Sequence, residues 1–301
     1  MTEFGAASEQ GDAPKALRAL VEDALGKHSL AWTKPDTGLT PAHRFIVTFE
    51  DGARAFVKGA TTPTTASQLR NEHFALQHAS PMAPRILAWL DNASMMPVLL
   101  TEALDGHWPA THRGVNWRPG DLDLVFSRLA ELRLRPAPVG LPPNPPHRAT
   151  DWADLATLSS ETVASARWFE RNAPVLAAAE AALDRNGSAF VHGDMRSDNI
   201  CVMSHGVGFV DWAGAHAGSP EEDLATFLPT AHLEGGPRPY DVFPDGGGWA
   251  VALAGEAFRL AREEAAPDWL RRVALRLAAI NLDWAVASLG LEPRERTPRG
   301  D

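Results

Sequence analysis

One segment of the sequence, residues 189–212, restricts the fold more than any other. It reads AFVHGDMRSDNICVMSHGVGFVDW and alternates apolar runs of strand length with polar loops, whereas the sequence on both sides has helical patterns. Two of its apolar runs flank the turn letters SHG and predict a hairpin. That hairpin would return Asp211 to the end of the sheet where Asn199 stands, with Asp194 five residues before Asn199. The segment therefore predicts a group of polar side chains at one edge of a sheet.

A small antiparallel sheet is predicted N-terminal to this segment. The run FIVTFEDGARAFVKGA has two strand-like halves around Asp51 and Gly52, which form a typical hairpin turn. Residues 66–79 follow with helical spacing, and RILAWL and MPVLLTEAL predict further strands. Residues 30–103 are therefore expected to form an antiparallel sheet with one inserted helix.

The rest of the chain has mainly helical patterns, so we predict an α+β protein with a flexible tail and two lobes. The expected boundaries are 1–13 for the tail, 14–103 for the first lobe and 104–301 for the second. A proline-rich stretch at 135–148 cannot continue a helix and predicts an extended loop. A helix is expected within GDLDLVFSRLAELRLR (120–135), with Asp121 as N-cap. Further helices are expected over 151–158, 160–171, 174–185 with Pro174 in the first turn, 219–229 with a capping box from Ser219 to Glu222, 247–264 and 267–289.

Composition excludes several classes of protein. The net charge is −10 and the chain has only four lysines, which argues against binding to nucleic acid. The single cysteine, Cys201, cannot form an intramolecular disulfide or a cysteine-based zinc site. The N-terminus is acidic where a signal peptide would be basic, and no apolar run is long enough to span a membrane. We therefore expect a soluble cytoplasmic protein with no membrane partner.

The polar residues of the 189–212 segment are the types that phosphoryl transfer requires. Magnesium prefers amide and carboxylate oxygens, which suits Asn199 and Asp211. Asp194 could then orient or deprotonate a hydroxyl group. Taken singly, these residues are also ordinary turn formers. Together they favour metal-assisted phosphoryl transfer.

Two motifs, HGDMRSDN and VDWAGAHAGSPEEDLA, resemble those of the aminoglycoside phosphotransferase-like small-molecule kinases. That family shares the bilobal protein-kinase fold, with a small sheet lobe and a larger helical lobe. Position by position, the resemblance implies that Asp194 is the catalytic base and that Asn199 and Asp211 are the magnesium ligands. It also implies that His192 supports the catalytic loop and that Asp223 braces that loop.

The resemblance further implies that a strand lysine pairs with a helix glutamate in the N-terminal, nucleotide-binding lobe. Lys58 and Glu72, fourteen residues apart, fill those positions. Lys58 would then hold the α- and β-phosphates of ATP or GTP. The hinge backbone from Glu102 to Leu104 would read the base.

The sequence departs from the family pattern at three places. No GxGxxG precedes Lys58, so backbone amides of residues 37–42 are expected to cover the phosphates. The catalytic loop lacks the proline of many relatives, and Arg196 within it would either touch the moving phosphate or form a salt bridge. Only eleven residues separate Asp211 from Asp223, too few for the activation segment of a protein kinase. A small acceptor is therefore favoured over a protein.

The expected function is magnesium-dependent transfer of the γ-phosphate of a nucleoside triphosphate to a hydroxyl of a small molecule. An aminoglycoside or nucleoside antibiotic is the first expectation for the acceptor, with resistance by modification as the consequence. A metabolite such as an amino alcohol or sugar is the alternative. A catalytically silent nucleotide-binding scaffold is the rival from another class, and intact Asp194, Asn199, Asp211 and Lys58 argue against it.

Overall fold

The computed structural model describes residues 13–35, 42–93, 95–111, 114–157 and 163–294. Their contacts group into two compact units. The first unit contains the described residues up to Pro143 together with Ser188–Pro220, and the second contains Asn144–Gly187 and the described residues from Glu221 onward. The lobe boundary expected after residue 103 stays a prediction, and most of the expected tail lies outside the described residues.

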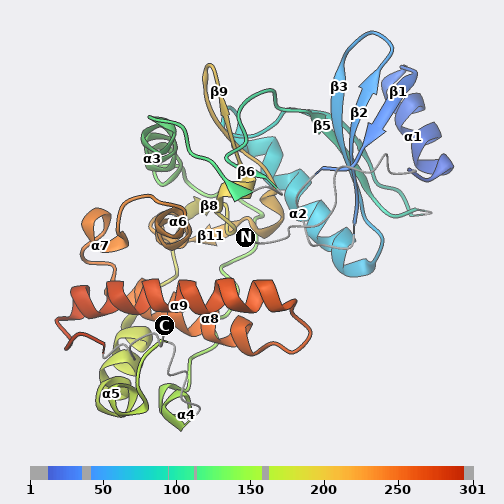
Figure 1. The fold of residues 1–301 in the computed structure, drawn as a ribbon. Helices are drawn as coiled ribbons and strands as arrows, with labels where there is room; N and C mark the ends of the chain where they lie inside the picture. The colour runs from blue at the N-terminus through green and yellow to red at the C-terminus, as the bar shows by residue number, and fades with distance from the viewer. Residues whose placement is uncertain (1–12, 36–41, 94, 112–113, 158–162, 295–301) are drawn as a thin grey trace. The chain divides into compact units, whose positions relative to one another are not determined.

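A five-stranded antiparallel sheet occupies the N-terminal part of the first unit (Figure 1). Its spatial order is β1-β2-β3-β5-β4, and helix α2 (Pro63–Ala79) lies between β3 and β4 in the chain. The strands are β1 (Ser29–Thr33), β2 (His43–Phe49), β3 (Arg54–Gly59), β4 (Ile86–Leu90) and β5 (Val98–Glu102). The predicted sheet with one inserted helix is confirmed.

One face of this sheet packs against a helix that the sequence patterns did not predict. Helix α1 (Lys15–Leu25) places Leu17 and Val21 in a core with alternate residues of the strands. The strand residues in that core are Trp32, Phe45, Val47, Phe49, Ala55, Val57, Val98 and Leu100. Full burial of each large apolar side chain contributes about 1.5–3 kcal/mol. Because strand side chains alternate, the residues between them, Lys58 among them, lie on the opposite face.

The remainder of the first unit carries the first motif and residues 210–220 of the second. Strand β8 (Ala189–Val191) pairs with β11 (His216–Gly218), and β9 (Ile200–Met203) pairs with β10 (Gly206–Phe209). The hairpin predicted around the turn SHG is thereby confirmed. The other elements are β6 (Ala110–Thr111), β7 (Gly114–Val115), α3 (Asp121–Leu132) and the short 3₁₀ helices η1 (Ser197–Asn199) and η2 (Trp212–Gly214).

The helix expected within 120–135 is α3, and the expectation that Asp121 caps it is wrong by one position. Gly120 occupies the N-cap and Asp121 is the first helical residue. The Asp121 carboxylate instead accepts a hydrogen bond from the backbone amide of Arg118 at 2.8 Å. Gly120 has φ 88, a conformation that glycine adopts without the steric cost of a side chain.

The second unit is helical. Long helices α8 and α9 pack side by side, with α5 against α8 and α6 against α9 (Figure 1). The helices are α4 (Trp152–Thr157), α5 (Ala166–Ala182), α6 (Glu222–Leu233), α7 (Pro239–Val242), α8 (Gly247–Arg262) and α9 (Asp268–Leu289).

Two predicted helix starts in this unit are wrong. The helices expected over 160–171 and 174–185 are one helix, α5, with Pro174 in its interior. An interior proline costs about 3 kcal/mol, but the buried face continues across it through Trp168, Asn172 and Leu176. The helix is continuous because packing of that face outweighs the missing hydrogen bond.

Helix α6 begins at Glu222, two residues after the first helical position, Pro220, that a cap at Ser219 would give. Glu221 occupies the N-cap position and makes no side-chain capping bond. The Glu222 carboxylate is buried and accepts hydrogen bonds from Arg185 at 3.0 Å and Asn144 at 2.6 Å. A buried carboxylate needs such partners, and here they come from other segments of the unit.

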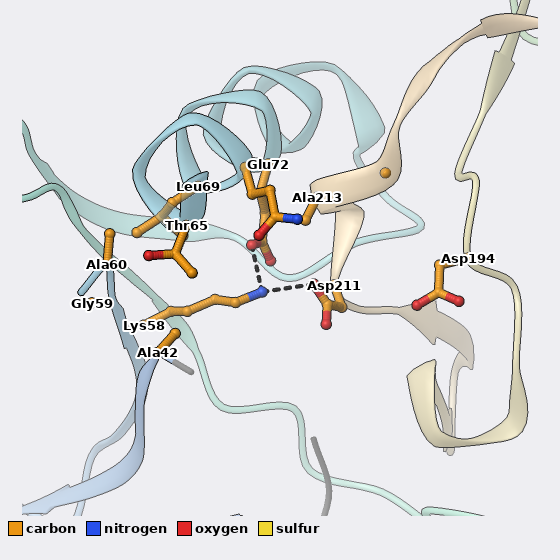
Figure 2. A pocket seen from close by; sticks show the side chains of 12 residues that line it. Ala42, Lys58, Gly59, Ala60, Thr65, Leu69, Glu72, Asp194, Asp211 and Ala213 are labelled. Atoms are coloured by element: carbon orange, nitrogen blue, oxygen red, sulfur yellow. Dashed lines mark hydrogen bonds and ion pairs between the residues drawn. The ribbon is translucent and has the colours of Figure 1, made fainter. Parts of the chain in front are cut away.

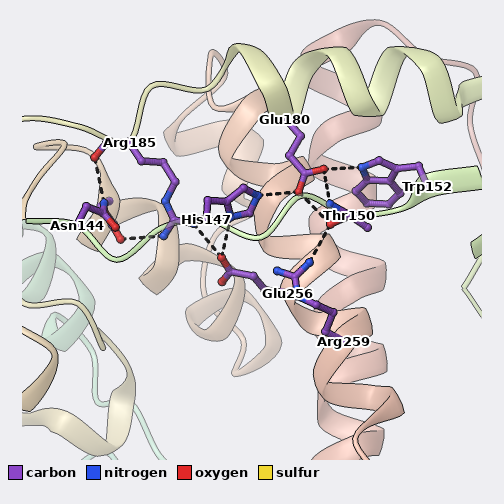
Figure 3. A network of polar contacts seen from close by, with 9 residues as sticks. Asn144, His147, Thr150, Trp152, Glu180, Arg185, Glu256 and Arg259 are labelled. Atoms are coloured by element: carbon purple, nitrogen blue, oxygen red, sulfur yellow. Dashed lines mark hydrogen bonds and ion pairs between the residues drawn. The ribbon is translucent and has the colours of Figure 1, made fainter.

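A buried polar network links the proline-rich segment to α5 and α8 (Figure 3). The carboxylate of Glu180 on α5 accepts hydrogen bonds from the backbone amide and hydroxyl of Thr150 and from the indole of Trp152. His147 Nε2 lies 2.8 Å from Glu180, and Arg185 donates to His147 Nδ1 at 3.0 Å. Since Nδ1 accepts that bond, Nε2 carries the proton and donates to Glu180. The segment expected to be an extended loop is thus fixed to the helices.

No helix in the described part of the chain combines the length and the apolar character needed to cross a membrane.

Candidate active site

Lys58 on β3 is the centre of a buried group of charges. Its Nζ lies 2.6 Å from Glu72 Oε2 on α2 and 2.6 Å from Asp211 Oδ1 (Figure 2). The Lys58 side chain is 11 % exposed and that of Glu72 is 7 % exposed. The predicted strand lysine and helix glutamate are therefore in contact, and the aspartate of the second motif joins them.

The charges in this group shift one another's pKa. Burial alone would lower the pKa of Lys58, but the carboxylates of Glu72 and Asp211 raise it above its usual value. Burial alone would raise the pKa of Asp211, but the Lys58 ammonium brings it below its usual value. Burial keeps the pKa of Glu72 raised although Lys58 opposes this. At neutral pH Lys58 and Asp211 are both charged.

Helix α2, which carries Glu72, is held by a cap at its N-terminus and by hydrogen bonds to the loop after Asp211. Thr62 caps the helix in a reciprocal box with Thr65. Asn71 directly precedes Glu72 on the same helix. Its side-chain amide donates hydrogen bonds to the carbonyl oxygens of Ala213 and Ala215 at 3.0 and 2.8 Å. Helix α2 is thereby fixed to the segment that immediately follows Asp211.

The backbone of Asp211 has a conformation that side-chain-bearing residues rarely adopt. Its φ is 64° and its ψ is 59°, and it is the only non-glycine residue in the described ranges with a positive φ. Aspartate tolerates this left-handed region better than most residues. Such conformations concentrate at functional sites, where surrounding contacts hold them in place.

The HGD loop is held together by its own side chains. The Asn199 amide nitrogen donates to the backbone oxygen of Asp194 at 2.8 Å and to its carboxylate at 3.2 Å. His192 is fully buried, accepts from the Asp194 amide through Nδ1 and therefore donates to Val210 through Nε2. This places His192 between the loop and the residue before Asp211, where a supporting residue is expected.

Arg196 contacts the proposed base directly. Its Nε lies 2.9 Å from Asp194 Oδ1, and its Nη2 lies 3.3 Å from Asp194 Oδ2 and 3.3 Å from Asp198 Oδ2. Of the two alternatives for Arg196, the salt bridge is the contact that the structure contains. Burial alone would lower the pKa of Arg196, but the two carboxylates raise it.

Two glycines make the close approach of the two motifs possible, and the sequence reasoning missed them. A Cβ on Gly193 would lie 2.3 Å from the carbonyl oxygen of Gly214, and Gly193 has φ +81°. A Cβ on Gly214 would lie 3.4 Å from the Gly193 backbone. The letters HGD and DWAG contain both glycines, so the signal was present in the motifs themselves.

A cavity of about 230 Å³ connects these groups. Figure 2 shows the Lys58 side chain extending toward Glu72 and Asp211, with Asp194 on the far side of Asp211. Thr65 and Gln68 of α2 also line the cavity and were not predicted as site residues. The remaining lining residues are Ala42, Gly59, Ala60, Leu69, Ala213 and Gly214.

The oxygen atoms present suit a magnesium ion. Within the described segments, neither Asn199 Oδ1 nor Asp211 Oδ2 has a protein hydrogen-bond partner, because Asn199 uses its nitrogen and Asp211 its Oδ1. Both are hard oxygen donors of the kind magnesium prefers. The described part of the chain contains no group of three or more His, Cys, Asp or Glu residues arranged as a metal site. A site with few protein ligands is what magnesium uses when phosphates complete its coordination.

Of the predicted site residues, Lys58, Glu72, Asp194 and Asp211 line this cavity. His192, Arg196 and Asn199 contact Asp194, and neither Glu102 nor Leu104 lines the cavity. Glu102 ends β5, and its carboxylate accepts from the amide of Arg85 at 2.9 Å. Leu104 lies against Gly208, where an added Cβ would be 2.8 Å from it. Asp223 is buried in α6 and belongs to the second unit. Their roles at the hinge and beneath the loop stay predictions.

Comparison with known structures identifies the fold. The chain shares 12 % identity and a TM-score of 0.59 with a spectinomycin phosphotransferase in complex with ADP and spectinomycin, covering 93 % of this chain and 100 % of that one. It shares 13 % identity and a TM-score of 0.58 with the GDP and kanamycin complex of APH(2")-IIia, covering 90 % and 99 %. It shares 18 % identity and a TM-score of 0.53 with a candidate fructosamine-3-kinase from Thermobifida fusca, covering 90 % and 100 %. At these identities the likeness shows the fold, which is the expected protein-kinase-like one.

Comparison of sequences identifies the family. No sequence among proteins with curated annotation matches this chain. The model of the phosphotransferase enzyme family matches residues 33–260, a range that includes Lys58, Glu72, Asp194 and Asp211. The chain belongs to the phosphotransferase enzyme family.

Proposed function

We propose that this enzyme transfers the γ-phosphate of ATP or GTP to a hydroxyl of an antibiotic, an aminoglycoside or nucleoside antibiotic being the first candidate. The observation that carries the proposal is the contact of Lys58 with both Glu72 and Asp211 in a cavity that Asp194 also lines. A cation held in this way can bind phosphate oxygens, and a nearby carboxylate can act on the acceptor.

Each charged residue has a role in this proposal. Lys58 binds the α- and β-phosphates, and Glu72 keeps its ammonium in place. Asn199 and Asp211 would hold a magnesium ion, which when bound would neutralise phosphate charge. Asp194 accepts the proton of the acceptor hydroxyl.

The contacts of Asp194 are compatible with a role as base. Each carboxylate oxygen has two lone pairs, so bonds from Arg196 and Asn199 leave an acceptor position for the hydroxyl proton. We propose that Arg196 holds Asp194 in the orientation for this transfer and lies close enough to touch the transferred phosphate. The hinge from Glu102 to Leu104 is proposed to read the base.

Two acceptor classes remain candidates on specific grounds. Two neighbours in fold are named for complexes with kanamycin and spectinomycin, and a third is named as a candidate fructosamine kinase. A sugar-like metabolite therefore fits as well as a sugar-containing antibiotic. The net charge of −10 favours a cationic or neutral acceptor in either class. Antibiotic resistance follows only from the first class.

The proposed location is the cytoplasm, where nucleoside triphosphates are supplied. The only cysteine is buried in β9, and burial raises its pKa to about 12, so it is an inert core residue.

A mass-shift screen tests the proposed function. The purified chain, magnesium and ATP or GTP are incubated with aminoglycosides, nucleoside antibiotics, amino alcohols and sugars, and each compound is examined for the mass of one added phosphate. Asp194→Ala should lower turnover on the order of 10²-fold or more. Asp123→Ala, at an exposed position of α3, is the control and should keep wild-type turnover.

Wild-type turnover by Asp194→Ala would show that Asp194 is not the base. Nucleotide binding without phosphate transfer to any compound and without hydrolysis would favour the silent scaffold. Phosphate transfer to a protein instead of a small molecule would favour a protein kinase.

A further inference from the structure

Arg44 on β2 lies directly opposite Lys58. In the antiparallel register of β2 and β3, Arg44 pairs with Lys58, and the next residue of β2, Phe45, pairs with Val57. Phe45 and Val57 belong to the core beneath α1. Successive strand residues point to opposite faces, so Arg44 and Lys58 share the face that carries the proposed nucleotide site.

The charge of Arg44 acts on the same carboxylates as Lys58 does. Burial raises the pKa of Glu72, and the charges of Lys58 and Arg44 both oppose that increase. Burial would likewise raise the pKa of Asp211, and Arg44 contributes to lowering it. Arg44 is half-buried, so its field at these carboxylates is less screened than that of an exposed arginine.

Charge balance explains why a second cation is needed on this face. Lys58 is in contact with two carboxylates, and when both are ionised these three residues carry one excess negative charge. A nucleoside triphosphate is still anionic after it binds one magnesium ion, so this group alone would repel it. Two cations directly opposite each other in a sheet are destabilising unless anions lie between or beside them. Arg44 makes the group of four neutral before any ligand binds.

We propose that Arg44 is a second phosphate-binding cation of the nucleotide site, which contacts the phosphate chain from β2 while Lys58 contacts it from β3. Arginine suits this position because its planar guanidinium donates two parallel hydrogen bonds to phosphate oxygens. The chain has no GxGxxG before Lys58 to surround the phosphates with backbone amides. A side-chain cation on the neighbouring strand would supply the missing donors.

This inference rests on the proposed nucleotide donor, and binding measurements separate the two. Calorimetric titration of the full chain with ATP and magnesium, and separately with adenosine, distinguishes the phosphate contribution from the nucleoside contribution. Arg44→Ala is expected to weaken ATP binding about 10- to 100-fold, the range for loss of hydrogen bonds to a charged group. Adenosine binding should change less than about 2-fold, since the nucleoside has no phosphate.

Two further variants complete the experiment. Arg44→Lys keeps the charge but loses the paired donors, so its ATP affinity should lie between those of wild type and Arg44→Ala. Arg54→Ala is the matched control, because Arg54 is exposed on the same strand pair and lies four residues from Lys58, about 13 Å along the strand. It should bind ATP as the wild type does.

The outcomes discriminate clearly. Unchanged ATP affinity in Arg44→Ala, or an equal loss for ATP and adenosine, overturns the inference. If Arg44→Ala fails to fold, Arg44→Lys becomes the test. Wild-type ATP affinity in Arg44→Lys would contradict the inference, and so would a loss of ATP affinity in Arg54→Ala as large as that in Arg44→Lys. If the wild type binds nucleotide but phosphorylates nothing, the proposed phosphate transfer is wrong, while the ATP affinities of the Arg44 variants still test the role of Arg44. If the wild type binds no nucleotide, both are overturned.

Discussion

Replacement of Gly193 by alanine should distort the loop that carries Asp194 more than Gly214→Ala would. An alanine Cβ at this position would lie 2.3 Å from the carbonyl oxygen of Gly214 and 3.1 Å from Nδ1 of His216. Gly193 also has φ +81°, which disfavours any side chain. The substitution therefore introduces backbone strain and a steric overlap together.

The two penalties can be estimated separately. A left-handed conformation costs a non-glycine residue about 1–2 kcal/mol. Forcing an extra methyl into a packed region costs about 1–3 kcal/mol. Their sum predicts a loss of about 2–5 kcal/mol in the free energy of unfolding. Relief of the overlap also has to move the loop that carries Asp194, and a displacement of about 1 Å costs on the order of 10²-fold in turnover.

Urea denaturation and turnover measurements on Gly193→Ala and Gly52→Ala test this estimate. Gly52 has φ +80°, but nothing lies within 4 Å of its added Cβ. Gly52→Ala therefore has the strain without the overlap and should lose only about 1–2 kcal/mol with normal turnover. Equal losses in the two variants, or normal turnover by Gly193→Ala, would refute the argument from close approach.

Two further predictions concern other parts of the molecule. A Cβ on Gly255 would lie 1.8 Å from Thr150 Oγ1, which donates a hydrogen bond to Glu180. Gly255→Ala should therefore lower the free energy of unfolding, measured by urea denaturation, by about 1–3 kcal/mol. Unchanged stability would show that the network in Figure 3 tolerates displacement of Thr150. Burial would raise the pKa of Asp211, but Lys58 lowers it below its usual value. The charged carboxylate therefore contributes stability above its unfolded-state pKa of about 4. That contribution is lost as pH falls through the lower folded-state pKa. The stability difference between wild type and Asp211→Asn should accordingly be constant near neutral pH and shrink in strong acid, whereas a difference that persists unchanged at about pH 2 would contradict the assigned pKa direction.

Local patterns in the sequence were sufficient for the elements that contain strong signals. The Asp51-Gly52 turn predicted the hairpin of β2 and β3, and the SHG turn predicted the hairpin of β9 and β10. These turns are determined by a few adjacent residues, so distant contacts have little influence on them. Helix starts were less predictable. Pro174 lies inside α5 because a buried face on both sides of it favours one continuous helix.

The site shows the same division. The residue types in the 189–212 segment favoured phosphoryl transfer, and the resemblance to the small-molecule kinases implied that Lys58 and Glu72 pair. The contact of Lys58 with Asp211 spans 153 positions, and no local pattern contains it. Helix α1 was also missed, because an eleven-residue helix without a side-chain N-cap has a weak local signal.

The sequence by itself determined which side chains are available to this phosphotransferase: the carboxylates, the amide and the lysine that are predicted to act in phosphoryl transfer. Only the tertiary structure decided which of them meet. It placed Asp211 beside Lys58, set Gly193 against Gly214 and aligned Arg44 with Lys58. The physical reason is that side-chain chemistry is a property of each residue, whereas strand register and close backbone approach depend on the packing of the whole unit.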